Sequence, residues 1–445
     1  MKKISILLGS LLFITACSTD LEQSPSNIAN SDSLTDFEGV LNAAYYYQLG
    51  TVTPIAVMGE FRSDNAVMDE SPYTEFDEYD NGLTAMEDQF FGPFYTAVYK
   101  SILSANNVIE NSSNNVQIGE AKFLRALSYF KLVQVFGDVT VNLLAEPSLT
   151  DTSVLVRQPA ADVYNNVIIP DLNSAMALLG VTSDNGRASR YAAQSLLGKV
   201  YVAMGDFINA EPHLAAVVNG AASAGISLKT NFDEIFGAQN EVENSEIIFS
   251  TQITGSVTDE YSFGSDFWNW YVGDDSKADL PVDPDLVAAF DASDANGGGT
   301  DLRRAVTLNV DGLTAVKFPK EGGLGPEHDW IEIRLADIIL LYAETLNENS
   351  SPASTVLPLL DDIRTRAGLN SLTGTISSQA DVRQAIADER RLELAFEGHR
   401  WFDLVRTNTV DSEMGVTVNS NYYLFPVPVS EILATDGVIT QNAGY

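Results

Sequence analysis

Residues Glu389 to Arg406 read E-R-R-L-E-L-A-F-E-G-H-R-W-F-D-L-V-R, and the rest of the chain can be organised around this stretch. Apolar residues recur three or four positions apart on the way into it, which predicts a helix with one face toward a core. These residues are Val382, Ala385, Ile386, Leu392 and Phe396. A second apolar cluster, Trp401 to Val405, is interleaved with charged residues. Charges beside large apolar side chains normally form partly buried ion pairs, because burying an unpaired charge is costly. We therefore predict a structural ion-pair cluster of Glu397, His399, Arg400, Asp403 and Arg406.

The histidine in this stretch also allows a catalytic or metal-binding interpretation. His399 and Asp403 are four positions apart, so their side chains could touch on a helix, and Glu397 is close in sequence. A zinc site, however, needs a third and usually a fourth ligand, and the other histidines of the chain are His213 and His328. We predict a structural role, with no catalytic residue, no metal site and no cofactor.

The composition describes a large acidic protein. The 445 residues are 45% hydrophobic, which is ample for one large domain or two closely associated ones. Lys and Arg number 25 against 61 Asp and Glu, so the net charge is −36. Nucleic acids and anionic membrane surfaces are bound through Lys and Arg, so this charge argues against both as partners of the protein surface.

The first 33 residues have the pattern of an exported, lipid-anchored protein. Lys2 and Lys3 precede an apolar run that is shorter than the ~20 residues of a membrane-spanning helix, which predicts a signal peptide over residues 1–16. The sequence Ile14-Thr15-Ala16-Cys17 resembles a bacterial lipobox, which implies cleavage before Cys17 and lipidation of its thiol. Cys17 is the only cysteine of the chain, so no internal disulfide can form. Residues 17–33 are predicted to be a tether.

Helical periodicity dominates residues 34–220. A first helix is expected from Ser33 to Tyr45, a second from Phe90 to Ile109, and a third from Gly119 to Phe136. The third has such a wide apolar stripe that we expect burial on two sides.

Two stretches resemble tetratricopeptide repeats. Residues Arg187 to Val218 match the pattern in which a small residue lets two antiparallel helices approach and Gly205-Asp206 forms the turn. A looser copy runs from Arg334 to Gly368. The fold class predicted is mainly α, with such helix pairs as a scaffold.

Aromatic and polar residues follow the first helix. Tyr45, Tyr46 and Tyr47, followed by Gly50, suggest that the helix ends there, and Phe61 to Asn65 then suggest a loop. Such a loop can bind sugars, or its aromatic residues can belong to the core, and the sequence leaves both alternatives open. Asp64 and Asn65 are candidate sugar-binding residues.

Residues 221–330 change to short apolar runs, such as Ile247 to Thr251, among Gly, Asp, Ser and Asn. This composition predicts loops and a few strands packed on the scaffold, and loops on a rigid frame commonly carry recognition. Aromatic residues concentrate between Tyr261 and Tyr271, which indicates a platform for stacking sugar rings or a small core beneath a long loop. The candidate ligand-binding residues here are Trp268, Asn269, Trp270, Tyr271 and Trp330.

One acidic stretch invites a calcium interpretation. Asp291 to Asp301 read D-A-S-D-A-N-G-G-G-T-D, but alignment on Asn296-Gly297 puts Ala292 and Arg303 at the first and twelfth ligand positions of an EF-hand loop. We predict a flexible acidic loop instead.

Several motifs together resemble the SusD/RagB family of Bacteroidetes surface lipoproteins. They are the lipobox, the run F-L-R-A-L-S-Y-F-K-L-V-Q-V-F-G-D-V from Phe123 to Val139, the stretch Glu389 to Arg406, and L-F-P-V-P from Leu424 to Pro428. The resemblance implies a SusD-like fold with an N-terminal helical region (34–220), the loop-rich region (221–330) and a C-terminal region (331–445) in one globular unit. It also implies a lipid-anchored, outward-facing outer-membrane protein that captures a glycan and delivers it to a SusC-like TonB-dependent transporter.

Three other functions are alternatives to glycan capture. A peptide-capturing RagB-like lipoprotein and a tetratricopeptide scaffold for protein partners both remain open. An exported glycoside hydrolase is disfavoured, because the recognisable elements are helix pairs and no stretch places an acid at the end of a barrel strand.

Overall fold

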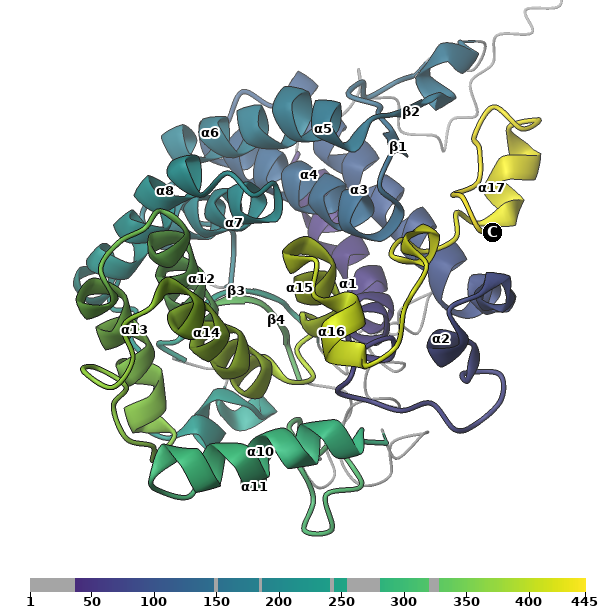
Figure 1. The fold of residues 1–445 in the computed structure, drawn as a ribbon. Coiled ribbons are helices and arrows are strands. Elements are labelled where there is room, and N and C mark those ends of the chain that lie inside the picture. Colours follow the sequence, from purple (N-terminus) through teal and green to yellow (C-terminus); the bar gives the residue numbers. More distant parts are fainter. Residues whose placement is uncertain (1–36, 148–150, 184–185, 241–243, 254–280, 320–327) are drawn as a thin grey trace, which may run out of the picture. The chain divides into compact units, whose positions relative to one another are not determined.

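Helices follow one another along most of the computed structural model, which describes residues 37–147, 151–183, 186–240, 244–253, 281–319 and 328–445 (Figure 1). The first helices are α1 (Glu38–Glu60), α2 (Glu75–Glu78), α3 (Gly92–Asn111), α4 (Asn115–Phe136), α5 (Ala160–Val163), α6 (Ile169–Leu178), α7 (Arg190–Ala203) and α8 (Phe207–Gly220). The later ones are α10 (Pro284–Gly297), α11 (Arg304–Thr307), α12 (Leu335–Glu348), α13 (Ala353–Arg366), α14 (Gln379–Leu394), α15 (Arg400–Thr407), α16 (Val410–Met414) and α17 (Val429–Ala434). Within these described ranges, no helix is long and apolar enough to cross a membrane.

Neighbouring helices pack in sequence order. Helix α1 packs on α3, α3 on α4, α4 on α6, α6 on α7, α7 on α8, and α8 on α12. Helix α4 contacts α1, α3 and α6, and nearly all its residues from Gly119 onward are buried, which confirms the expected two-sided burial. Its first turn is capped by Asn114, whose side chain accepts the backbone N–H of Val116.

Helices α7 and α8 form the pair predicted around Gly205-Asp206. The side chain of Asp206 caps α8 by accepting the backbone N–H of Asn209 at 3.2 Å. A Cβ atom on Gly198 of α7 would lie 2.4 Å from Leu214 Cδ2 of α8, so any larger residue there would displace the Leu214 side chain. The predicted helix pair is therefore confirmed, and its geometry is compatible with a tetratricopeptide-type repeat.

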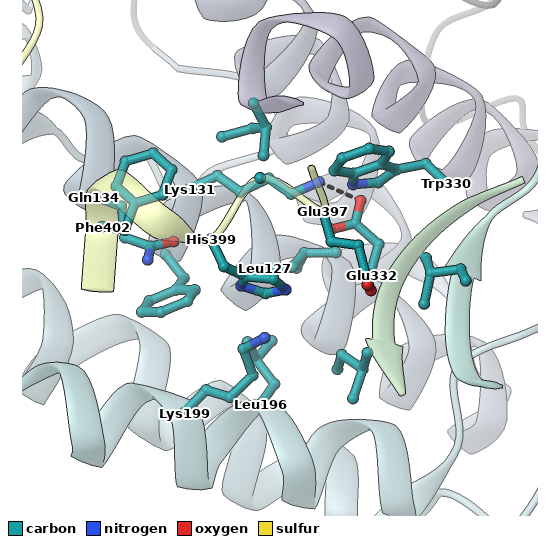
Figure 2. Close-up of a pocket in the computed structure, with 15 residues that line it drawn as sticks. Leu127, Lys131, Gln134, Leu196, Lys199, Trp330, Glu332, Glu397, His399 and Phe402 are labelled. Atoms are coloured by element: carbon teal, nitrogen blue, oxygen red, sulfur yellow. Dashed lines mark hydrogen bonds and ion pairs between the residues drawn. The ribbon is translucent and has the colours of Figure 1, made fainter. Parts of the chain in front are cut away.

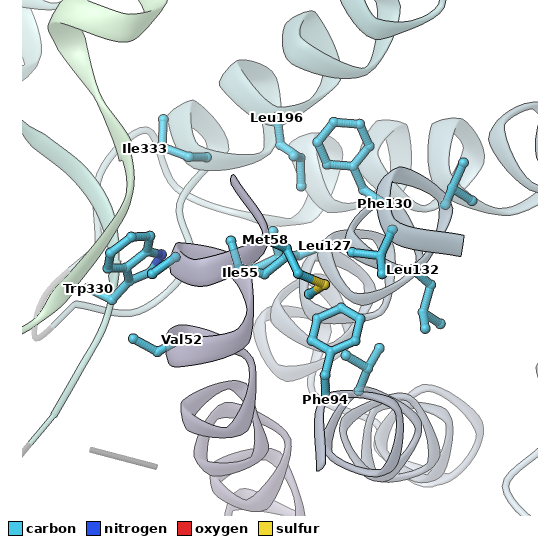
Figure 3. Packing of buried hydrophobic residues seen from close by; sticks show 14 of the residues in the cluster. Val52, Ile55, Met58, Phe94, Leu127, Phe130, Leu132, Leu196, Trp330 and Ile333 are labelled. Atoms are coloured by element: carbon cyan, nitrogen blue, oxygen red, sulfur yellow. The ribbon is translucent and has the colours of Figure 1, made fainter. Parts of the chain in front are cut away.

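Helices α12 and α13 form the second pair, and α14 packs on both. Their apolar faces enclose a second, smaller core that includes Ile339, Leu360, Val382 and Ile386. The main core gathers side chains from α1, α3, α4, α7 and β4, as Figure 3 shows for Ile55, Phe94, Leu127, Leu196 and Trp330.

Strands are few and short. Strand β3 (Ile247–Thr251), which the sequence predicts, pairs antiparallel with β4 (Trp330–Arg334), so that Thr251 lies opposite Trp330. Strands β1 (Val139–Thr140) and β2 (Arg157–Gln158) form a second antiparallel pair.

Two expectations about loops are wrong. Helix α1 does not end at Tyr45 to Tyr47 but continues to Glu60, because its second half is buried on every side and packing there outweighs Gly50 and Pro54. The acidic stretch after Asp291 is not a flexible loop, since Asp291 to Gly297 form the last turns of α10. The side chain of Asp283 caps α10 and Pro284 occupies its first turn, which are strong helix-start signals.

The stretch Glu389 to Arg406 forms two helices, α14 and α15, joined by residues 395–399, which we call the 395–399 turn. Phe396 and Gly398 both have positive φ values, of 65° and 74°. This turn packs against the end of α1: a Cβ atom on Gly59 would lie 2.2 Å from the carbonyl oxygen of Gly398. Glu60 accepts the backbone N–H groups of Gly398 and His399 at 2.8 and 3.1 Å.

Candidate functional site

The charged residues around the 395–399 turn are paired with one another. Arg400 donates two hydrogen bonds to Asp64, at 2.7 and 2.8 Å, although the two residues are 336 positions apart. Asp403 accepts from Arg390 at 3.0 Å and from Arg406 at 2.8 Å. Burial alone would raise the pKa of Asp403, but these two guanidinium groups hold it well below its usual range.

A second group of ion pairs lies deeper in the protein. Arg334 of β4 contacts Glu246, Glu393 and Glu397, at 2.9, 2.7 and 2.7 Å, and all four side chains are at most 4% exposed. Lys317 donates to Glu397 at 2.5 Å. Burial raises the pKa of Glu397 less than Arg334 and Lys317 lower it, so its net pKa is depressed. These partners are spread over about 150 residues of sequence, and single-sequence patterns give no signal that joins them.

A small cavity of about 60 Å³ borders this region, between α4, α7, β4 and the 395–399 turn (Figure 2). Lys131 and Glu332 form an ion pair of 2.5 Å at its edge, and Lys199 pairs with Asp337 at 2.6 Å. Burial, with the nearby Lys199 charge, lowers the pKa of His399 to about 4, so His399 is neutral at pH 7. The volume suits a few water molecules and is too small for a sugar ring.

No metal centre forms around His399 within the ranges that the structure describes. The one group of three potential ligands found there is Glu75, Glu78 and Asp80, on and after α2. Asp403 and Glu397, the acids that the catalytic interpretation requires, are instead occupied by Arg and Lys side chains.

Three of the predicted ligand residues are buried. Trp330 is 2% exposed and packs against Phe318, with ring centroids 6.2 Å apart. Asp64 and Asn65 are 3% and 0% exposed; Asp64 pairs with Arg400, and Asn65 donates to Glu60 at 2.9 Å. The aromatic or polar groups of these three residues thus contact the core and its ion pairs, and their role as ligand contacts stays a prediction.

The predicted lipidation residue and the remaining predicted ligand residues lie outside the described residues. These are Cys17, Trp268, Asn269, Trp270 and Tyr271.

A groove with a volume of about 450 Å³ lies between α10 and α14. Apolar side chains, among them Ala292 and Leu392, line it together with polar ones such as Gln384 and Asp388. Sequence patterns do not predict this groove, because the second half of α10 has the composition of an acidic loop.

Comparison with known families covers most of the chain. Residues 262–419 match a family model described as "SusD family", and residues 18–202 match one described as "Starch-binding associating with outer membrane". The chain belongs to the SusD family.

Individual SusD-family proteins are similar over nearly their whole length. SusD-like protein P2 of Formosa agariphila is 25% identical, with all of both chains covered. A crystal structure of a SusD superfamily protein from Parabacteroides distasonis superposes with a TM-score of 0.74 at 20% identity, covering 94% of this chain and 100% of that one. A laminarin-binding SusD-like protein superposes with a TM-score of 0.70 at 26% identity, covering 93% and 99%. The mainly helical fold is thus that of SusD-family structures.

Proposed function

We propose that this chain is a surface lipoprotein that captures an oligo- or polysaccharide and passes it to a SusC-like TonB-dependent transporter. Two matches together carry the proposal. Residues 18–202 match the starch-binding family model, and 93% of the chain superposes on a laminarin-binding structure. The ion-paired acids around the 395–399 turn support binding rather than hydrolysis, because hydrolysis of a glycosidic bond needs two carboxyl groups that face the substrate.

The anchor and the ligand contacts are parts of the same proposal. Cys17 carries the lipid that holds the protein on the outer membrane, facing outward. Trp268, Asn269, Trp270 and Tyr271 contact the glycan, the aromatic rings by stacking on the C–H faces of the sugars.

Binding can be tested with residues 18–445, which retain every contact described above. The protein is titrated with laminarihexaose, maltohexaose, alginate oligosaccharides and a peptide mixture. Binding is measured by calorimetry and by the change in tryptophan fluorescence. We expect saturable binding of one saccharide class, and Trp268→Ala or Trp270→Ala should weaken it by about 1–3 kcal/mol without unfolding the protein. Binding of peptides but of no saccharide would contradict the proposal and favour a peptide-capturing relative.

The anchor has its own test. Cys17→Ser in the full-length protein should move it from the outer-membrane fraction to the soluble fraction. Retention of the variant on the membrane would contradict lipidation at Cys17.

A further inference from the structure

The groove between α10 and α14 has the features of a ligand site. It is separate in sequence from the aromatic residues proposed above as glycan contacts. It is formed by the last three turns of α10, by α14 and by the segment after α13, and its volume of about 450 Å³ falls within the range of about 300–1,000 Å³ typical of small-molecule sites. We propose that this groove is a second saccharide-binding site, which holds a short, uncharged stretch of the glycan. The inference rests on the proposed function in that the ligand is a glycan.

Part of the groove is lined by apolar side chains, several of them alanines. These side chains include Ala289 and Ala292 of α10 and Ala385 and Leu392 of α14. A sugar ring presents an apolar C–H face, and small apolar side chains can cover that face without filling the groove.

Hydrogen-bonding groups stand along the rim. The amide of Gln384 donates to Asp388 at 2.9 Å, which leaves the amide oxygen and the second carboxylate oxygen for a ligand. Asp381 and Asn296 also line the groove. Asp388 is exposed at the surface of α14, and partial desolvation in the groove raises its pKa. A carboxylate accepts hydrogen bonds from the hydroxyl groups of a sugar, and a side-chain amide both accepts and donates them.

The charge of the groove selects against anionic sugars. Two arginines line it, but Arg391 is bound to Asp64 and Asn65, and Arg364 to Glu389. Among the described residues, neither Asp381 nor Asp388 forms an ion pair, so the charge offered to a ligand is negative. Hydroxyl groups of a neutral sugar fit this rim, whereas uronic acids or sulfate esters would be repelled.

The walls are held in place before any ligand binds. Ser293 of α10 donates to Asp301 at 2.8 Å, and the buried Arg303 links Asp301 to Glu389 of α14, with distances of 2.7 and 2.5 Å. The backbone N–H of Asn370 donates to the carbonyl of Gly297 at 2.8 Å. A preformed groove spares a ligand the cost of ordering it.

The experiment separates this groove from the aromatic contacts. Calorimetric titrations with laminarihexaose, maltohexaose and a galacturonic acid hexamer are made on residues 18–445 and on the Trp268→Ala/Trp270→Ala double variant. Each background also carries Ala292→Trp, which fills the groove from an exposed position, or Asp388→Ala, which removes an acceptor. Ala387→Trp is the matched control, because Ala387 is exposed on α14 and does not line the groove.

We expect the double variant to retain weak binding of a neutral hexamer. Asp388→Ala should weaken that residual binding by about tenfold or more, the effect of losing a hydrogen bond to a charged group. Ala292→Trp should weaken it by at least as much, because the indole occupies the space of the ligand, while Ala387→Trp leaves it unchanged. Wild-type binding that is abolished in the double variant, or is insensitive to both groove substitutions, would overturn the second site and leave the proposed function intact. If the unsubstituted protein binds no saccharide, the proposed function itself fails and the groove proposal with it.

Discussion

Arg400 and Asp64 are joined by two hydrogen bonds of 2.7 and 2.8 Å, and both residues are less than 10% exposed. The pair connects the first turn of α15 to the segment that follows α1, so it fastens the C-terminal region to the N-terminal one. A planar guanidinium binding a carboxylate through two parallel bonds is also the geometry that best offsets the cost of burying both charges.

Removing one partner of this pair should destabilise the protein. Arg400→Ala leaves the buried Asp64 with Arg391 alone, and we expect a loss of about 3–5 kcal/mol in the free energy of unfolding. Urea unfolding measures it. The matched control is Arg383→Ala: Arg383 also binds a carboxylate, Glu348, through two bonds of 2.7 Å, but its side chain is 50% exposed, so the loss should stay below about 1 kcal/mol. Equal losses in the two variants would show that the buried pair has no special role.

The contact between α1 and the 395–399 turn predicts a strong effect of one methyl group. In Gly59→Ala, the new Cβ would lie 2.2 Å from the backbone oxygen of Gly398, so the two segments must separate, and we expect a loss of about 1–3 kcal/mol or more. Gly39→Ala in the same helix is the control, because its Cβ meets no atom within 4 Å, and alanine should stabilise the helix by about 0.5–1 kcal/mol. Thermal unfolding of both variants checks this, and the expectation fails if Gly59→Ala unfolds no earlier than the wild type.

Glu60 should give the protein a measurable pH dependence. Burial raises the pKa of Glu60 from 4.5 to about 7, so between these values the folded state binds more protons than the unfolded state and stability falls as the pH rises. Glu60→Gln has no such charge. Its free energy of unfolding, taken relative to wild type, should therefore rise by about 3 kcal/mol between pH 4.5 and pH 8.

Taking the difference between the two proteins removes the contribution of other titrating groups, such as Asp77, whose pKa burial also raises to about 7. A difference that stays constant with pH would contradict the assignment.

Trp330 and the aromatic residues of 268–271 should respond in opposite ways. Trp330→Ala removes a ring from the main core, and we expect a loss of about 3–5 kcal/mol of stability with unchanged glycan affinity in the molecules that remain folded. The milder Trp330→Phe permits the affinity measurement if the alanine variant does not fold. An affinity loss in Trp330→Phe without a change in melting temperature would restore Trp330 as a ligand contact.

Local patterns predict the elements that depend on local signals. The buried helix after Gly119 and the turn at Gly205-Asp206 follow from apolar periodicity, a small residue and a capping side chain, all within a few positions. Strand β3 follows from a short apolar run.

Features that depend on distant partners could not be predicted in this way. Asp64 and Asn65 have the composition of a polar loop, and only their contacts with Arg400 and Glu60 show that they are buried. Trp330 is a residue type that often stacks on sugars, and it ends a loop-rich stretch of sequence. Only the pairing of β4 with β3 places it in the core. The groove depends on α10 lying beside α14, a relationship that no local spacing encodes.

The hydrogen bond between Glu60 and the backbone N–H of Gly398 spans 338 positions, which bears on how the protein is made. A chain that emerges from the ribosome N-terminus first can form α1 early. It cannot give Glu60 these backbone partners, or close the main core, until the 395–399 turn has also emerged. The nascent chain therefore stays incompletely folded through most of its synthesis, and fragments that end before Gly398 are expected to be open to proteases.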